Sequence, residues 1–556
     1  MSRSMTVADA IASDLGEMET SHVFGIPSIH NLPLYDAFQR HGGFRIVTAR
    51  TEGGAVNMAD GYARVTGKLG VVITSTGAGA GNAMGGLVEA VTAGSPLVHL
   101  TGQVPTPYLD SGRGYIHEFE GQNTMLGALD KGVYRVQRAA QASSIFRRAV
   151  AAALKAPQGP VSVEIPIDLQ AQRIERPQFY AASLVENEPD ATAIRAAADR
   201  LAGAARPVLW VGGGTIRSEA SDAVRTLADM LGAAVVTSQA GRGVITEDHP
   251  LCIGHFAAFP EAKVLIASGD LLLSAGVRFR GNETSNWDMV VPKIHIGIDI
   301  DPHASGRNFP STMSLVTDAR VGLETLIREL EGRAIDPKPG YRREVEGVRR
   351  AVRRRLRKTL GPWEAILDAI STTLPGNAIV VRDITIPNTS WGNRLIPIRT
   401  PRTSVHASGG GIGQGLPMAI GAAVGQPDRP VILLAGDGGF LFRLGDLATA
   451  REQDLGLTIV LYDDGGYGVI GNIQDRYMGG RRVGADLWTP DFETIGKAFG
   501  IETSRVGDAD RFRRYLEQAV SSPDIQMIVV DVKAIGPMHT PFAGPPGSGA
   551  ILEPHD

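Results

Sequence analysis

The sequence has few of the features that mark secreted, membrane-bound or nucleic-acid-binding proteins. Its 556 residues include one cysteine, Cys252, which excludes intrachain disulfides and cysteine-rich zinc sites and suits a reducing compartment. No apolar run reaches the roughly eighteen residues that a transmembrane helix needs. Residues 1–16 mix charged and apolar side chains, which is typical of an amphipathic first helix and not of a signal peptide. We therefore expect a cytoplasmic protein without a membrane anchor.

An excess of charge of one sign is also missing. The net charge is -4 over the whole chain, so no global field attracts nucleic acid or a membrane surface. The arginine-rich stretch 349–358 is a local exception. Val345, Val348, Val352 and Leu356 keep helical spacing among these arginines, which favours a solvated helix face or a linker. The length, with 43% apolar residues, predicts two to four domains of a large soluble enzyme subunit.

Three blocks follow one another along the chain. In the first, helix, strand and glycine-turn patterns alternate through residues 51–103, as in a parallel α/β domain. The second repeats strand, glycine turn, helix and strand from Pro207, although its Gly212–Gly214 turn lacks the full dinucleotide fingerprint. Pro337 and Pro339 mark a linker before the third. We predict an α/β protein with three consecutive parallel-sheet domains, at 1–174, 190–332 and 360–540.

The third block contains two apolar runs that each end in an aspartate beside glycines. Residues 431–435 read as a strand that stops at Gly-Asp-Gly, a helix should follow up to Leu455, and residues 457–462 read as a second strand. A right-handed crossover makes the strands parallel, so Asp437 and Asp464 should meet at one edge of the sheet. Such a pair can hold a divalent cation while glycine N–H groups receive phosphate oxygens. Alternatively, each aspartate only caps a helix.

This pair of turns resembles the signature of thiamine diphosphate enzymes, and the order of the three blocks resembles their acetolactate synthase, pyruvate oxidase and benzaldehyde lyase branch. The resemblance implies thiamine diphosphate and Mg²⁺ as cofactors, a pyrimidine-binding first domain, a central domain and a diphosphate-binding third domain. It also implies a homodimer or homotetramer with sites between domains of two subunits. The metal ligands would be Asp437, Asp464 and the Gly466 carbonyl, where Asp464 replaces the usual Asn. The same turns supply the further cofactor-binding residues Gly436, Gly438, Gly439, Tyr467 and Gly468.

Glu52 begins a predicted helix with the pattern Met-Ala-Asp-Gly-Tyr-Ala-Arg at residues 58–64. An acid at a helix start is favourable in itself. The pattern, however, resembles the helix that carries the cofactor-activating glutamate of this branch, which bonds the pyrimidine ring and promotes loss of the thiazolium proton. The loop "ASGGGIGQG" resembles the one that grips the other face of the pyrimidine. By this resemblance the Gly410 carbonyl accepts from the amino group and Ile412 bends the cofactor.

His30, His117 and Gln122 are the candidates for proton transfer and for contact with the reacting carbonyl. Benzaldehyde lyase and some 2-oxo acid decarboxylases place a histidine where His30 stands, and "GRGYIHE" resembles guanidino-oxo-acid decarboxylases. Either histidine can instead be structural, with His30 bonded to backbone carbonyls. The paired histidines of pyruvate decarboxylases are missing, which argues against a simple alcohol-forming decarboxylase.

We expect decarboxylation of a 2-oxo acid, with carboligation of the acetolactate synthase type as one outcome. A 2-hydroxyketone lyase resembling benzaldehyde lyase is the alternative within the class. From another class, a nucleotide-binding protein or magnesium phosphohydrolase would use both aspartates but would leave Glu52 and Ile412 without a role. A relative that binds the cofactor without turnover is disfavoured by Glu52. The sequence leaves the substrate open, and also whether FAD binds the middle domain, since "SAGVRFRGN" matches the flavin-contacting stretch only loosely.

Overall fold

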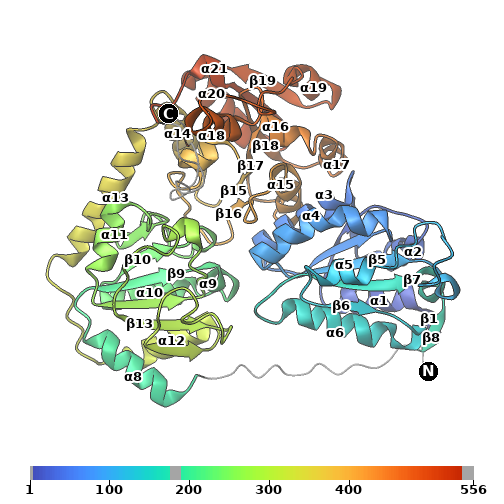
Figure 1. Cartoon of the computed structure of the whole chain (residues 1–556), viewed down its shortest axis with the longest axis horizontal. Helices are drawn as coiled ribbons and strands as arrows, with labels where there is room; N and C mark the ends of the chain where they lie inside the picture. Colours follow the sequence, from blue (N-terminus) through green and yellow to red (C-terminus); the bar gives the residue numbers. More distant parts are fainter. Residues whose placement is uncertain (1–3, 176–188, 541, 543–556) are drawn as a thin grey trace.

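The computed structural model describes residues 4–175, 189–540 and 542. Three α/β domains surround a common junction: in Figure 1 the third domain is at the top, the second lies below it on the left, and the first lies below it on the right. Each contains a sheet of six parallel strands with helices on its faces. Parallel sheets are buried on both faces, which explains the continuous apolar runs of strands such as residues 457–463. The predicted fold class is confirmed.

The first domain has the strand order β3-β2-β4-β5-β7-β6. Its strands are β2 (His22–Gly25), β3 (Arg45–Thr48), β4 (Gly70–Thr74), β5 (Leu97–Gln103), β6 (Val133–Arg135) and β7 (Val161–Pro166). Its helices are α1 (Val7–Glu17), α2 (Leu32–His41), α3 (Glu52–Thr66), α4 (Ala78–Ala93), α5 (Gln122–Gly127), α6 (Ala142–Leu154) and α7 (Ile167–Gln170). An antiparallel pair, β1 (Ser4–Thr6) and β8 (Arg173–Glu175), joins the two ends of the domain.

The middle domain has the order β11-β10-β9-β12-β13-β14, the strand order of the doubly wound dinucleotide-binding fold. Its strands are β9 (Pro207–Val211), β10 (Ala234–Thr237), β11 (Cys252–Gly254), β12 (Leu271–Ala275), β13 (Ile294–Asp299) and β14 (Met313–Val316). Its helices are α8 (Ala191–Ala202), α9 (Gly213–Arg217), α10 (Ser221–Leu231), α11 (Pro260–Ala267) and α12 (Ala319–Leu330).

Helix α13 (Tyr341–Arg357) leads to the third domain and carries the arginine-rich stretch. Val345 and Val352 are buried, while Arg355 pairs with Glu261 at 2.8 Å. Arg349 and Arg353 are half-buried and donate to the His249 carbonyl at 2.6 Å and to the Leu395 carbonyl at 3.3 Å. The arginine-rich stretch is therefore only in part a solvated helix face.

The third domain has the order β16-β15-β17-β18-β20-β19. Its strands are β15 (Ile379–Arg382), β16 (Ser404–His406), β17 (Val431–Gly436), β18 (Leu457–Asp463), β19 (Glu502–Val506) and β20 (Ile525–Asp531). Its helices are α14 (Trp363–Thr373), α15 (Gly415–Gly425), α16 (Asp437–Leu441), α17 (Asp446–Glu452), α18 (Gly468–Tyr477), α19 (Phe492–Ala498), α20 (Ala509–Val520) and α21 (Val532–Ile535), with a π-helical turn at Asn388–Gly392. Numbered within each domain, its strands follow the same order as those of the first domain.

Helices α3 and α15 follow the second strand of their domains and pack against each other. Both contain Met-Ala-x-Gly, at 58–61 and 418–421. Gly61 lies against the backbone of Met418 and Gly421 lies against the backbone of Met58, so close that a methyl group on either glycine would collide. Farther along, Gln426 donates to the Val65 carbonyl at 3.3 Å. The helices therefore run in the same general direction, and both begin at the same side of the interface.

Two sequence expectations were wrong in detail. The first helix begins at Val7, because residues 4–6 pair with β8 as strand β1. The single helix expected between Gly438 and Leu455 is two helices, α16 and α17, separated by residues 442–445. In that break, Arg443 leaves the domain and donates to Thr51 at 2.9 Å. The break thus lies where the third domain contacts the first.

Candidate active site

Asp437 and Asp464 meet beyond the carboxyl ends of β17 and β18, as the crossover argument predicted. Asp437 is fully buried at the first position of α16. One of its oxygens accepts from Gly438 N at 2.8 Å, and the other accepts from Gly465 N at 2.8 Å and Gly466 N at 3.1 Å. Burial and the neighbouring Asp437 raise the pKa of Asp464 to about 7. Two acids are thus held together in a poorly hydrated place.

The surroundings of this pair fit a divalent cation. Oδ1 of Asp464 is buried without a hydrogen-bond partner, and the Gly466 carbonyl lies close to Gly438, in the same turn. A cation would satisfy the free oxygen and remove the repulsion between the carboxylates. Among the described residues no group of three or more His, Cys, Asp and Glu side chains is arranged to hold a metal. A cation here would therefore take its remaining ligands from the backbone, water or a bound phosphate.

The loop with Gly410 and Ile412 is shaped by Asp383, a residue whose role the sequence did not disclose. The buried Asp383 accepts from Gly413 N at 3.2 Å and from Gly415 N at 3.0 Å. Burial raises its pKa to about 6, although the backbone N–H groups oppose that rise. Gly410 has a φ of +79°, which favours glycine. The aspartate therefore fixes the end of the loop that enters α15, while Gly410 is exposed and Ile412 is half-buried.

Glu52 is the first residue of α3, directly after the N-cap Thr51. Its Oε2 accepts from Asn82 of α4 at 3.1 Å. Because α3 and α15 start at the same side of their interface, Glu52 and the Ile412 loop lie toward the same end of this helix pair. In this structure the two domains belong to one chain, and a site shared between subunits stays a prediction.

His30 lies on the turn between β2 and α2, at the carboxyl edge of the first sheet, where it was predicted. It is 3% exposed, its Nδ1 has no hydrogen-bond partner, and its ring lies edge-on to His117 at 5.2 Å between centroids. Burial, together with His117, holds the pKa of His30 below its usual value. Nδ1 is thus not engaged with a backbone carbonyl, and the two candidate histidines are neighbours.

Gln122 is fully buried inside the first domain. Its oxygen accepts from Thr76 at 2.9 Å and from Gly77 N at 2.7 Å, and its nitrogen donates to Glu164 at 2.7 Å. Gly77 has a φ of +59° and lies against the backbone carbonyl of His117. These contacts favour a role in holding the turn beside His117 over direct contact with a reacting carbonyl.

The middle domain has a cavity of about 520 Å³ at the carboxyl ends of its strands. Gly214 follows β9 and Gly276 follows β12, the two strands between which the strand order reverses. Three arginines and three aspartates line the cavity, which residues 154–158 of the first domain border: Arg217, Arg278, Arg307, Asp299, Asp301 and Asp318. Open α/β sheets bind ligands at this position. The cavity is therefore a candidate ligand site with both basic and acidic side chains in its lining.

Comparison with protein families accounts for all three domains. Residues 5–125 match "Thiamine pyrophosphate enzyme, N-terminal TPP binding domain", residues 194–326 match the central domain of the same family, and residues 387–532 match its C-terminal TPP binding domain. The chain belongs to the thiamine pyrophosphate enzyme family. The predicted resemblance is confirmed, and thiamine diphosphate is the cofactor that these domains indicate.

Curated relatives and a solved structure extend over nearly the whole chain. The "Probable 2-ketoarginine decarboxylase AruI" of Pseudomonas aeruginosa is 34% identical over 95% of this chain and 94% of that protein. The "Probable acetolactate synthase large subunit" of Methanocaldococcus jannaschii is 30% identical over 97% and 94%. "X-ray structure of a putative thiamin diphosphate-dependent enzyme isolated from Mycobacterium smegmatis" matches with a TM-score of 0.79 and 27% identity over 95% and 99%. This chain is thus a thiamine pyrophosphate enzyme of the acetolactate synthase and decarboxylase family. None of the described helices is long and apolar enough to span a membrane.

Proposed function

We propose that this enzyme uses thiamine diphosphate and Mg²⁺ to decarboxylate a 2-oxo acid, and that it can pass the acyl fragment to an acceptor. The observation that carries the proposal is the meeting of the buried Asp437 with the half-buried Asp464, one of whose oxygens is buried between glycine turns without a hydrogen-bond partner. Neither helix capping nor packing explains that oxygen. A phosphohydrolase could use the acids too, but it would give no role to Glu52 at the start of α3.

Asp437, Asp464 and the Gly466 carbonyl would hold Mg²⁺, and the N–H groups at the start of α16 would receive phosphate oxygens. When bound, thiamine diphosphate supplies a thiazolium carbon that attacks the substrate carbonyl and takes up the electrons released by bond cleavage. Glu52 would exchange a proton with the pyrimidine ring, and the Gly410 carbonyl would accept from its amino group. His30 and His117 would exchange protons with the substrate oxygen.

A 2-oxo acid with a guanidino group is the first substrate to test. The 34% identity to the "Probable 2-ketoarginine decarboxylase AruI" covers almost all of both chains, and "GRGYIHE" spans His117 of the histidine pair. Acetolactate formation from pyruvate is the second candidate, supported by the several acetolactate synthase large subunits among the relatives. A 2-hydroxyketone lyase reaction is the third.

A screen of carbon dioxide release separates these reactions. Purified enzyme with thiamine diphosphate and Mg²⁺ is given 2-oxo acids with guanidino, aliphatic or aromatic side chains, with and without an aldehyde acceptor. We expect release from at least one 2-oxo acid. Cleavage of benzoin without any release from 2-oxo acids would favour the lyase, and hydrolysis of a phosphate ester without either would overturn the proposal.

A nucleotide cofactor such as FAD would bind in the middle-domain cavity, which lies where the strand order of this sheet reverses. An absorption spectrum of the purified protein distinguishes flavin from a colourless ligand. We further propose a cytoplasmic homodimer or homotetramer. Apolar side chains near the histidine pair are exposed in the single chain, Ile29 by 72% and Ile116 by 71%, and a second copy would cover them. Light scattering measures the oligomeric state.

A further inference from the structure

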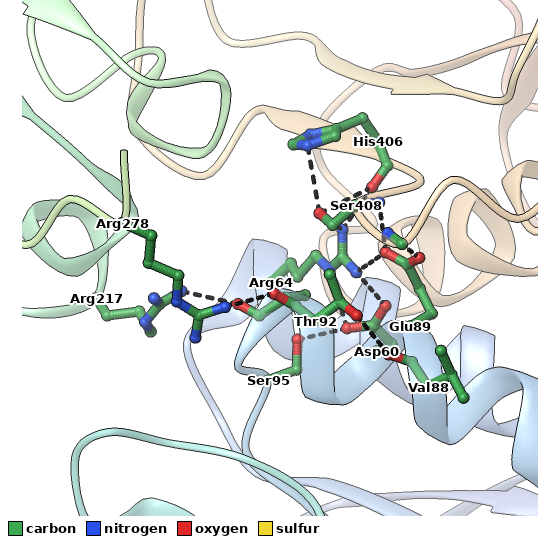
Figure 2. A network of polar contacts seen from close by, with 12 residues as sticks. Asp60, Arg64, Val88, Glu89, Thr92, Ser95, Arg217, Arg278, His406 and Ser408 are labelled. Atoms are coloured by element: carbon green, nitrogen blue, oxygen red, sulfur yellow. Dashed lines mark hydrogen bonds and ion pairs between the residues drawn. The ribbon is translucent and has the colours of Figure 1, made fainter. Parts of the chain in front are cut away.

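The start of the Gly410 loop is held by side chains from the first domain. Figure 2 shows Arg64 of α3 and Glu89 of α4 reaching residues 406–409 of the third domain. Glu89 accepts from Ser408 N at 2.6 Å and from Gly409 N at 2.7 Å. Arg64 donates to the His406 carbonyl at 2.7 Å. Three hydrogen bonds thus fix the backbone just before Gly410.

These side chains form a buried ionic cluster. Glu89 and Asp60 are both fully buried, and Arg64 donates to Glu89 at 2.7 Å and to Asp60 at 2.5 Å. Burial raises the pKa of Asp60, which Arg64 opposes. Removing several charges from water is costly, and apolar side chains join domains at least as well. The need to hold the two domains together does not by itself account for this ionic cluster. The cluster does, however, fix the positions of the Ser408 and Gly409 backbone N–H groups.

The middle domain supports the same place. Arg280 donates to the Thr92 carbonyl of α4 and to the Ser408 carbonyl, both at 2.9 Å. Arg278 also donates to the Thr92 carbonyl, at 2.7 Å, and Arg217 donates to the Ala93 carbonyl at 3.1 Å. In Figure 2 Arg217 and Arg278 approach the end of α4 from the middle domain. Cations at the last carbonyls of a helix are favourable, so α4 is a firm base for Glu89.

The loop is consequently anchored on both sides of its exposed tip. Glu89 holds residues 408 and 409, and Asp383 holds residues 413 and 415. No neighbouring atom lies within 4 Å of where a Gly410 side chain would begin. The segment between the anchors contains the carbonyl and the apolar side chain that face the cofactor in the proposed function.

We propose that Glu89 is a positioning residue for the cofactor: from the first domain it sets the third-domain loop in the shape that binds the pyrimidine of thiamine diphosphate. This inference rests on the proposed function. It assigns to α4 a part in cofactor affinity, although Glu89 itself does not touch the cofactor. Loss of a contact that orients a metal ligand typically costs about 10–100-fold in affinity or activity. We expect an effect of the same order for a contact that orients this loop.

Glu89→Gln tests the proposal. The amide cannot accept from Ser408, Gly409 and Arg64 together, so we expect the dissociation constant for thiamine diphosphate, measured by calorimetry with Mg²⁺ on the cofactor-free enzyme, to rise about tenfold or more. The measurement is made well below the melting temperature of the variant. A merely structural Glu89 would lower the melting temperature and leave the dissociation constant of the folded enzyme unchanged.

Gly409→Ala provides a second variant that keeps every charge. Its methyl group would lie 2.9 Å from Oε2 of Glu89 and would push the carboxylate from its place. We expect weaker cofactor binding with a melting temperature close to that of the wild type. Gly347→Ala on α13, where the methyl group meets nothing within 4 Å, is the matched control.

The outcomes separate this inference from the proposed function. Wild-type enzyme that binds no thiamine diphosphate would overturn the proposed function and this inference with it. If the wild type binds thiamine diphosphate and both folded variants, Glu89→Gln and Gly409→Ala, bind it with the same dissociation constant, only the proposed role of Glu89 is overturned. Weaker binding in both variants, with unchanged binding in Gly347→Ala, supports it.

Discussion

Asp464 stands beside Asp437 with one oxygen buried and unbonded, and the charge of Asp437 helps to raise its pKa to about 7. Without a cation, the ionised pair repels itself in a place that water reaches poorly. With a cation, the same pair becomes a ligand set. The arrangement is unfavourable alone and favourable when occupied.

The two aspartates should respond differently to substitution. Asp437→Ala removes the acceptor for three backbone N–H groups as well as a ligand, so calorimetry should detect no retention of thiamine diphosphate with Mg²⁺. Asp464→Asn should still bind Mg²⁺, because the amide oxygen can coordinate. It should also melt at a higher temperature than the wild type in metal-free buffer near pH 8, because the repulsion is gone. Loss of Mg²⁺ binding in Asp464→Asn would count against the ligand assignment.

Glu52→Gln should fold and bind cofactor as the wild type does, because the helix start and its Thr51 cap are kept. An amide cannot supply the same acid–base bond to the pyrimidine, so exchange of the thiazolium proton should slow roughly a hundredfold or more. NMR of the bound cofactor in deuterated buffer measures this rate. Exchange at the wild-type rate would remove Glu52 from proton transfer.

His30→Ala tests whether this buried imidazole, whose Nδ1 has no hydrogen-bond partner, moves protons. If it does, turnover should fall about a hundredfold or more, and the melting temperature should stay nearly unchanged. The depressed pKa of His30 makes it neutral near pH 7 and able to accept a proton. An unchanged rate in a well-folded variant would shift the role to its neighbour His117 or to water, and His117→Ala then becomes the deciding measurement.

A chain of hydrogen bonds in the first domain links His99 to Asp130, and these two groups should change the stability of the fold with pH in opposite directions. His99 contacts Ser162 at 2.8 Å, and Ser162 donates to Asp130. Burial lowers the pKa of His99 to about 4, so protons bind the unfolded chain first and His99 destabilises the fold as pH falls from about 6.5 to 4, by up to about 3 kcal/mol. Burial raises the pKa of Asp130 to about 7, so its protonated form stabilises the fold at low pH, and that contribution is lost as pH rises toward 7.

Melting temperatures of His99→Gln and Asp130→Asn, taken relative to the wild type across this range, should therefore change with opposite slopes. The melting temperature of His99→Gln should rise relative to that of the wild type as pH falls. The melting temperature of Asp130→Asn should rise relative to that of the wild type as pH rises. Differences that stay constant with pH would show that neither group titrates as described.

Local patterns were sufficient to predict the three parallel sheets and the meeting of Asp437 with Asp464, because a strand, a crossover and a second strand leave one geometry. The position of His30 followed from the same rule. The break between α16 and α17 was not predictable: it lies at a contact between domains, where Arg443 donates to Thr51, a residue distant in sequence. Asp383 and Glu89 were missed for the same reason: each acts on backbone N–H groups distant in sequence, and no spacing records such a bond.

The two Met-Ala-x-Gly segments give the enzyme an internal symmetry. Gly61 packs on Met418 while Gly421 packs on Met58, a reciprocal exchange of the kind that relates the halves of a symmetric dimer. Glu52 and Ile412 stand six residues before Met58 and Met418, so the acid and the apolar wedge are counterparts on two copies of one fold. One polypeptide thus contains both members of a symmetric helix pair. Substituting either glycine changes the packing of the methionine backbone that it contacts on the other helix. A substitution in one of these helices would therefore need a compensating change in the other helix for the two to pack as before.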